Sequence, residues 1–464
     1  MGGVYHWYSL IMFADGLPDD ARRLVLHHLP VRSLIACEGV SKHLRSAATE
    51  DEIWRSRCEE HWPRCNIGSA APSCRACFAN ANGWWQLSTL PRTIIECVSG
   101  RRPRGYSNEI TAIDSDETTV ISAMDTICLR SGETEKAWKL GKYQKVNDLK
   151  LLPDGSGAAL ALIHGAPAGD DLSDNLCGLC QVVRLDAHSV EYGTMNAPLP
   201  EPVWSNRDTE GTARFGRRYS ALLLSGPSHA FLLNTHDNVF PLARLDLSSG
   251  ALTDERGTHH DWPVYDWKLR SACADGDGSP HELTIGMMRA SESVLVHHDI
   301  RVPDPRNGTL QATGHAHVRR VRQGSTGTHT VLTSHSRSKA IEVWDLRKFG
   351  SSGFGSGSAG GGTAGHVTPR AEPADRFVCA GNAPDMHCAH GIVTAISGGP
   401  PGTTYGAKLH VFSASPRRLS AECALPEIVI DDGHRLTCPL GITRTGRTLT
   451  LIADRQRLLQ CRVP

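Results

Sequence analysis

The sequence lacks a net charge, a long apolar run and the marks of a secreted protein. It has 464 residues with 49 Lys+Arg and 49 Asp+Glu, which argues against a general binder of nucleic acid or other polyanions. No apolar run reaches the ~20 residues that a membrane span needs. The apolar stretch at 4–14 is short and has no basic segment before it, so it does not fit a signal peptide. We therefore expect a cytoplasmic or nuclear protein without a membrane partner.

Signatures of common enzymes and cofactor sites are also missing. There is no P-loop, no Gly-x-Ser-x-Gly elbow and no His-Glu-x-x-His motif. The 15 cysteines are an odd number in a long chain, which is typical of reduced thiols rather than a disulfide framework. Cys58, Cys65, Cys74 and Cys77 could form a zinc site, but their spacing is irregular and free thiols are the simpler interpretation. We expect no catalytic activity, no cofactor and no metal.

The N-terminal part shows helical spacing. Asp19 and Asp20 follow Pro18, as in a first helical turn, and Pro30 ends this segment. The less polar residues on one face of this first helix are Ala21, Leu24, Val25, His28 and Leu29. Similar spacing predicts three further short helices, around 34–37, 40–48 and 53–58. So small a helical core gains stability by packing on a partner.

The same residues resemble an F-box. The resemblance rests on Leu17-Pro18, Val25-Leu26, Leu29-Pro30, Leu34, Val40-Ser41-Lys42 and Ile53-Trp54-Arg55. It departs from the family pattern at Ala21 and Leu44, where Leu and Trp are usual. F-boxes bind the Skp-type adaptor of cullin–RING ubiquitin ligases, so the resemblance implies adaptor contacts from Leu17, Pro18, Val25, Leu26, Leu29, Pro30, Leu34, Val40 and Trp54. A generic helical cap is the alternative.

Short β-rich runs replace the helical spacing after residue 85. They lie at 119–123, 158–163, 181–185, 221–224, 293–297, 330–333, 340–344, 391–396, 408–412 and 448–452. Similar strand ends recur at intervals of about 50–65 residues, which predicts seven repeated units. Many short strands without helices, over this length, favour a seven-bladed β-propeller. Six or eight blades, or an unrelated all-β array, are the alternatives. The run at 90–98 is expected to pair with a last strand and close the ring.

One of these units resembles a WD repeat. Gly314-His315 stands ahead of Trp344-Asp345, with two strand-like runs between them. In that family a His, a Ser or Thr and a Trp share a hydrogen-bond network with a turn Asp. The resemblance implies that His315, Ser334 (or Thr333), Trp344 and Asp345 fill the corresponding positions. The turn at 336–339 contains no Asp, so the family network is incomplete here.

The fold class that follows is mostly β, with two unequal domains. We expect an N-terminal extension (1–14), an F-box-like helical domain (15–62), a linker (63–87) and a WD-repeat-like β-propeller (88–464). Residues 350–366 are rich in Gly and Ser and are interpreted as a loop between strands of one blade rather than a linker between domains.

Arginine clusters suggest how such a propeller would bind a substrate. Arg217, Arg218, Arg319, Arg320 and Arg322 lie in different units. If they meet on one face, they would hold an acidic or phosphorylated protein segment, because guanidinium matches both anions. Solvated loop arginines are the alternative. Asp114, Asp116, Asp170, Asp171 and Asp174, the candidates for hydrolase chemistry, are more typical of turns.

The two parts together imply a connector. By the resemblance, the chain is the substrate-recognition subunit of an SCF-type ubiquitin ligase, with the F-box on the adaptor and the propeller on a protein substrate. Catalysis would then be proximity supplied by other subunits. A non-degradative propeller scaffold is the main alternative, and a propeller enzyme is a third.

Overall fold

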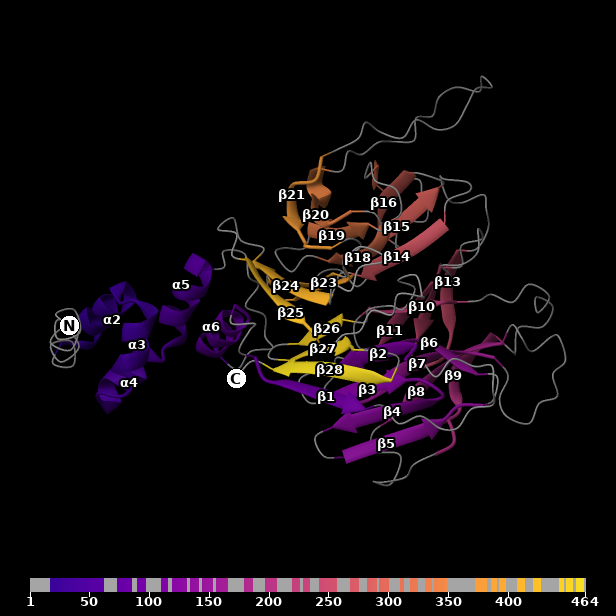
Figure 1. Cartoon of the computed structure of the whole chain (residues 1–464), viewed down its shortest axis with the longest axis horizontal. Helices are drawn as coiled ribbons and strands as arrows, with labels where there is room; N and C mark the ends of the chain where they lie inside the picture. Colours follow the sequence, from indigo (N-terminus) through magenta and orange to yellow (C-terminus); the bar gives the residue numbers. More distant parts are fainter. Residues whose placement is uncertain are drawn as a thin grey trace, which may run out of the picture.

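The computed structural model describes residues 17–61, 73–85 and 90–462, the last range with gaps at many loops. The longer gaps are 97–109, 166–178, 187–196, 207–218, 257–267, 300–308, 349–371, 398–406 and 427–441. Figure 1 shows a group of helices standing beside a much larger assembly of strands. The predicted division into a small helical part and a large β part is confirmed.

The N-terminal helices are α2 (Asp19–His28), α3 (Val31–Cys37), α4 (Lys42–Ala48) and α5 (Asp51–His61). Pro18 and Pro30 stand directly before α2 and α3, where a missing N–H costs nothing. Ser41 precedes α4, and its hydroxyl accepts a hydrogen bond from the Leu44 N–H at 3.1 Å. All four predicted helices are therefore present.

The buried face of α2 differs from the face predicted. Arg22, Leu26 and Leu29 point into the domain, whereas Leu24 is 63% exposed. These buried positions follow the i, i+4, i+7 spacing of one helix face. Arg22 can lie there because its guanidinium donates to the Leu17 carbonyl oxygen at 2.7 Å and to Asp19 Oδ1 at 2.8 Å, while its stem packs against apolar neighbours.

The β-domain consists of seven four-stranded sheets, which we call blades 1 to 7. Blade 1 holds β2 (Ala112–Ser115), β3 (Thr119–Ala123), β4 (Thr126–Ser131) and β5 (Thr134–Lys139). Blade 2 holds β6 (Lys145–Leu151), β7 (Ala159–His164), β8 (Cys180–Leu185) and β9 (Pro202–Ser205). Blade 3 holds β10 (Ala221–Ser225), β11 (His229–Leu233), β12 (Leu242–Asp246) and β13 (Leu252–Arg256). Blade 4 holds β14 (Lys268–Ala274), β15 (Glu282–Arg289), β16 (Glu292–Asp299) and β17 (Thr309–Ala312).

The last three blades follow the same order, with one exception. Blade 5 holds β18 (Val318–Gln323), β19 (Thr330–His335), β20 (Ala340–Asp345) and β21 (Asp375–Val378). Blade 6 holds β22 (Asp385–Ala389), β23 (Ile392–Ser397), β24 (Ala407–Ser413) and β25 (Ser420–Leu425). Blade 7 holds β26 (Ile442–Thr445), β27 (Thr448–Ile452), β28 (Arg457–Arg462) and, from the other end of the domain, β1 (Arg92–Glu96).

The blades close into a ring around their first strands. Strands β2, β6, β10, β14, β18, β22 and β26 contact one another in that order, and β26 contacts β2 again. Strand β1 pairs antiparallel with β28, from Arg92 opposite Cys461 to Glu96 opposite Arg457. This confirms the pairing predicted for 90–98. The Gly- and Ser-rich segment falls between β20 and β21 of one sheet, and its own residues lie outside the described ones.

Burial within the blades reflects their packing face to face. Every residue of β3, β23 and β27 is buried, because a middle strand has a neighbouring blade on each side. Apolar clusters accordingly span adjacent blades, such as blades 1 and 2 through Trp138 and Leu149, or blades 5 and 6 through Phe377 and Phe412. Among the described residues, such clusters join most pairs of neighbouring blades.

Candidate functional site

The helical domain uses much of its predicted contact set for its own core. Leu26, Leu29, Leu34 and Trp54 are each at most 2% exposed, and the Trp54 indole donates to the Ala48 carbonyl oxygen at 2.7 Å. Their side chains are enclosed in the core of the domain itself, and their role as adaptor contacts stays a prediction. Leu44, one departure from the family pattern, is also fully buried.

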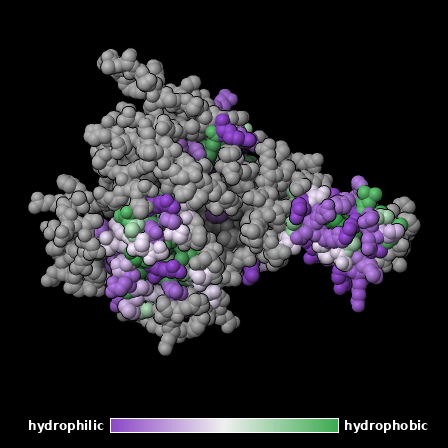
Figure 2. Space-filling view, turned by 180° about the vertical axis from the view of Figure 1, so that it is seen from behind, coloured by the Kyte–Doolittle hydropathy of each residue, from purple (hydrophilic) through white to green (hydrophobic). Residues whose placement is uncertain are grey.

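Other apolar side chains remain open to a partner. Pro18 and Pro30 are exposed, and Leu17, Val25 and Val40 are partly exposed. Two residues absent from the predicted set are among the most exposed large apolar side chains described: Leu24 in α2 is 63% exposed and Ile35 in α3 is 52% exposed. We call Pro18, Leu24, Pro30 and Ile35 the exposed apolar set. Figure 2 shows apolar surface interspersed with polar surface on this domain.

Side-chain bonds fix the helices that carry this set. Arg57 of α5 donates to the carbonyl oxygens of His27 at 2.5 Å and Leu29 at 2.6 Å, and so satisfies the open end of α2. Arg23 of α2 pairs with Glu50 at 2.8 Å. These contacts hold α2 against α5 and the residue that precedes it, and leave Leu24 on the outer surface of the domain.

A further helix, α6 (Cys74–Gly83), lies within the predicted linker. Asp51 Oδ1 accepts the Cys74 N–H at 3.0 Å, and Arg75 makes two bonds to the Glu38 carboxylate at 2.7 and 2.6 Å. The Arg75 guanidinium also lies 5.9 Å from the centre of the Trp54 ring. Helix α6 is therefore tied to the helical domain by charge and by packing.

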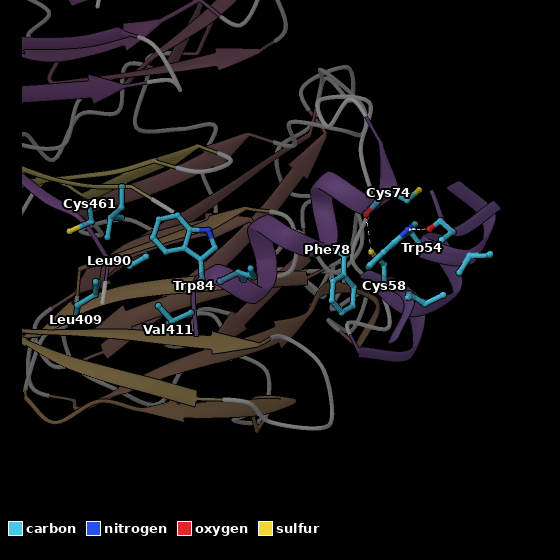
Figure 3. Packing of buried hydrophobic residues seen from close by; sticks show 14 of the residues in the cluster. Trp54, Cys58, Cys74, Phe78, Trp84, Leu90, Leu409, Val411 and Cys461 are labelled. Atoms are coloured by element: carbon cyan, nitrogen blue, oxygen red, sulfur yellow. Dashed lines mark hydrogen bonds between the residues drawn. The ribbon is translucent and has the colours of Figure 1, made fainter. Parts of the chain in front are cut away.

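The same apolar cluster runs on into the β-ring. Phe78 meets Trp54 edge to face at 5.3 Å between ring centres. Trp84 is fully buried and belongs to the same cluster as Leu409 of blade 6 and Leu451 of blade 7. Figure 3 shows Trp54 and Phe78 at one end of this cluster, Leu409 and Cys461 at the other, and Trp84 between them. The helical domain and the ring thus share one core through α6.

Blade 5 contains a buried polar network of the kind predicted, with different members. The Trp344 indole donates to Thr333 Oγ1 at 2.9 Å, and Thr333 Oγ1 lies 3.1 Å from His335 Nε2. His335 Nε2 lies 3.3 Å from Glu342 Oε2, and Arg376 Nε lies 3.2 Å from Glu342 Oε1. Thr333, the alternative of the sequence analysis, is the residue that binds Trp344.

The remaining predicted members have other positions. Ser334 is buried on the opposite face of β19, and its hydroxyl has no hydrogen-bond partner, so its predicted role is wrong. Asp345 binds the Arg347 backbone N–H at 3.1 Å and the Arg347 guanidinium at 2.9 Å. His315 lies outside the described residues.

The blades on either side of blade 5 each contain a similar pair of a hydroxyl and an imidazole. Thr284 Oγ1 lies 3.0 Å from His297 Nδ1 in blade 4, and Ser397 Oγ lies 2.9 Å from His410 Nε2 in blade 6. Burial lowers the pKa of His410 below its usual value, against a raising effect of Glu422. Both pairs join a Thr or Ser on the second strand to a His on the third: Thr284 lies directly opposite His297, whereas Ser397 is a diagonal neighbour of His410, two residues beyond the residue opposite it. Only the strand register reveals such pairs.

The predicted substrate-binding arginines separate in the structure. Arg320 of β18 binds Asp385 of β22 through two bonds, at 3.1 and 3.4 Å, so it links two blades and is not a free anion receptor. Arg322, two residues further along β18, donates only to the Val321 carbonyl oxygen at 3.2 Å. The backbone of Arg319 lies in β18, but its side chain is outside the described residues, as are Arg217 and Arg218.

The other predicted groups give no site among the described residues. Asp114 is inside the ring and accepts backbone N–H bonds from Ser115 and Leu151. Asp116, Asp170, Asp171 and Asp174 lie outside the described part, as do Cys65 and the side chain of Cys77. Cys58 and Cys74 form no disulfide, Cys58 Sγ lies 3.6 Å from the Cys74 carbonyl oxygen, and no group of three metal-ligating side chains occurs where the structure describes them. No described helix is long and apolar enough to cross a membrane.

Comparison with known proteins agrees with both parts of the fold. A family model described as F-box-like matches residues 14–60. The WD40 domain of Toxoplasma gondii coronin is 11% identical, with a TM-score of 0.50, over 81% of this chain and 87% of that domain. The Dos1 propeller is 11% identical with a TM-score of 0.48, over 81% of this chain and 95% of that chain. At 11% identity the likeness to the coronin domain shows the fold alone. A search of curated proteins found no match.

Proposed function

We propose that this chain, which carries an F-box-like domain ahead of a WD-type β-propeller, is the substrate-recognition subunit of an SCF-type ubiquitin ligase. F-box domains generally bind Skp-type adaptors, and the match to residues 14–60 is the observation that carries the proposal. The adaptor would connect the chain to a cullin–RING complex, and the ring would hold a protein substrate.

The exposed apolar set supports the adaptor contact. Leu24 and Ile35 present large apolar side chains on α2 and α3, on a domain whose core is already filled by Leu26, Leu34 and Trp54. Burying a Leu or Ile side chain against a partner contributes about 1.5–3 kcal/mol. Two such side chains supply a substantial part of the free energy of a stable complex.

The shared core supports a receptor that holds its substrate at a set distance. Trp84 is fully buried between α6 and the ring, and Arg75 is bonded to Glu38 at both ends of its guanidinium. A buried core of this kind resists relative motion of the two domains. Fixed separation is what proximity catalysis by other subunits requires, so we propose no catalytic step by this chain. We also propose that it acts in the cytoplasm, the nucleus or both.

The test is binding of the full chain to a purified Skp-type adaptor by calorimetry. The double variant Leu24→Glu/Ile35→Glu loses both apolar contacts and should weaken binding roughly 100-fold or more. The matched control is Val378→Glu, since Val378 of β21 is 71% exposed but lies in the ring. Leu29 is a poorer target because it is buried, so its loss would damage the domain itself.

Two outcomes would contradict the proposal. Wild-type chain that does not bind the adaptor would favour the alternative, a propeller scaffold that assembles complexes without degradation. Equal weakening by Val378→Glu and by the helical double variant would show that the helical domain is not the contact surface.

A further inference from the structure

The acidic side chains between residues 17 and 50 are all paired with arginines of the same chain. The pairs, with nitrogen–oxygen distances between 2.6 and 3.9 Å, are Asp19–Arg22, Asp20–Arg23, Glu50–Arg23 and Glu38–Arg75. The negative charge of α2, α3 and α4 is therefore already balanced by neighbouring guanidinium groups, and no acid of this segment is left for its other cations.

Two cations of the same segment have no partner among the described residues. Arg32 in α3 and Lys42 in α4 are exposed, and neither side chain makes a hydrogen bond or an ion pair within the described part of the chain. We call these two residues the free cations. A third cation, Arg45 of α4, donates to the backbone carbonyl oxygen of Glu38 at 2.8 Å and pairs with no described acid. The positive charge of α3 and α4 is thus not compensated inside the domain.

The positions of the free cations do not favour the helices that carry them. Arg32 is the second residue of α3 and Lys42 is the first residue of α4, and neither helix has an acid in its first turn. The N-terminal end of a helix carries partial positive charge, so a cation there lowers helix stability. Helices α2 and α5 instead have acidic first turns. The free cations therefore stabilise the domain neither by pairing nor through the helix dipole, and their charge is available to a partner.

The exposed apolar side chain of α3 lies between positive charges. Arg32 and Ile35 are three residues apart and are neighbours on one helix face, and Ile35 is 52% exposed. On the other side, the Arg45 guanidinium is bonded to the carbonyl oxygen of Glu38, three residues after Ile35. The surface that fits this arrangement has an apolar patch for Ile35 and carboxylates beside it.

We propose that Arg32 and Lys42 bind carboxylates on the adaptor, so that the docking face of the adaptor is an apolar patch with an acidic border. This inference rests on the proposed function and names the chemistry of its partner. The whole chain has 49 Lys+Arg and 49 Asp+Glu, so the attraction comes from this part of the surface alone. Complementary charges of this kind speed association and select the partner. A nucleic acid fits less well, because its phosphates cannot cover the apolar area of Ile35 and Leu24.

The experiment measures binding of the full chain to a purified Skp-type adaptor by calorimetry at about 50 mM and about 500 mM salt, where screening is weak and strong. Arg32→Glu and Lys42→Glu each reverse one charge, and Arg32→Lys keeps it. The matched control is Lys139→Glu, because Lys139 is an exposed cation on β5 of the ring. Urea unfolding of each variant shows that the domain is intact, as expected for exposed side chains without bonds. A short DNA duplex is added as a competitor.

Each charge reversal should weaken adaptor binding about tenfold at the lower salt concentration and less than about threefold at the higher one. Arg32→Lys and Lys139→Glu should bind as the wild type does, and the duplex should not displace the adaptor. Three results would overturn the inference: wild-type affinity that is the same at both salt concentrations, equal weakening by Lys139→Glu, or displacement of the adaptor by DNA.

The apolar double variant Leu24→Glu/Ile35→Glu, measured on the same adaptor, separates this inference from the proposed function. If the wild type binds, the double variant fails and the charge reversals have no effect, the docking surface is correct and only the acidic border is wrong. If the wild type does not bind the adaptor at either salt concentration, the proposed function is wrong and the inference falls with it.

Discussion

Removing Arg320 from the ion pair with Asp385 should lower the free energy of unfolding far more than removing Asp385. The Asp385 side chain is 2% exposed and that of Arg320 is 28% exposed. In Arg320→Met the buried carboxylate keeps only the Met386 N–H at 3.0 Å, and loss of a partner for a buried charge costs about 3–5 kcal/mol. In Asp385→Asn the guanidinium is still reached by water, so we expect a cost of about 1–2 kcal/mol.

Urea unfolding of the full chain at pH 7 measures these free energies of unfolding. The double variant Arg320→Met/Asp385→Asn removes both charges and should be more stable than Arg320→Met alone, which gives a coupling energy of about 2 kcal/mol between the two sites. Arg347→Met is the control, because Arg347 is 69% exposed and surface pairs contribute about 0–1 kcal/mol. If the two single effects simply add, or if Arg320→Met costs no more than the control, the reasoning about buried charge in the ring is wrong.

Further expected outcomes concern the network in blade 5, a buried histidine and the domain junction. Thr333→Val removes the acceptor of the Trp344 indole and should cost about 1–3 kcal/mol in urea unfolding, whereas Ser334→Ala should be neutral because that buried hydroxyl has no partner; equal costs would contradict the assignment. Burial holds the pKa of His410 below 6.5, so the unfolded chain takes up a proton that the native chain refuses, and stability should fall as pH drops below about 6.5. His410→Gln should reduce the change of Tm with pH between about pH 5 and 7, and the same Tm profile in the variant and the wild type would refute this. Trp84→Ala should cost about 3–5 kcal/mol and speed proteolysis between helical domain and ring; an unchanged cleavage rate would show that the junction is not held by this core.

The elements themselves could be predicted from the sequence because their signals are local. Pro18, Pro30 and the acidic first turn fix where α2 and α3 begin, and the strand at Thr119–Ala123 was expected at the same residues. The closing strand β1 followed from the need to cover an open edge. Boundaries set by proline and by strand length depend on a few neighbouring residues and not on the rest of the fold.

The site residues were harder, since they depend on which face of an element is buried. Apolar residues lie on several sides of α2, at Leu24, Val25 and Leu26, and the packing of α4 and α5 against this helix decides that Leu24 faces outward. Arg22 was not among the residues predicted for the buried face, yet its long stem lies in the core. Ser334 and Thr333 are adjacent in β19, so their hydroxyls lie on opposite faces of the strand, and only the Thr333 hydroxyl reaches Trp344.

Side-chain contacts between distant segments could not be predicted, although the pairing of the closing strand could. Arg320 and Asp385 are 65 residues apart, and ring closure alone brings β18 against β22. One member of the predicted arginine cluster therefore forms a bond between two blades, which depends on the order of the blades in the ring.

The most direct test of the account is the dissociation constant of the purified full chain with a purified Skp-type adaptor. We expect a one-to-one complex with a dissociation constant of about 1 µM or lower, a binding free energy near −8 kcal/mol, through a domain that presents Leu24 and Ile35. No complex at concentrations of roughly 100 µM, a free energy weaker than about −5.5 kcal/mol, would contradict the central claim that the helical domain is an adaptor-docking module.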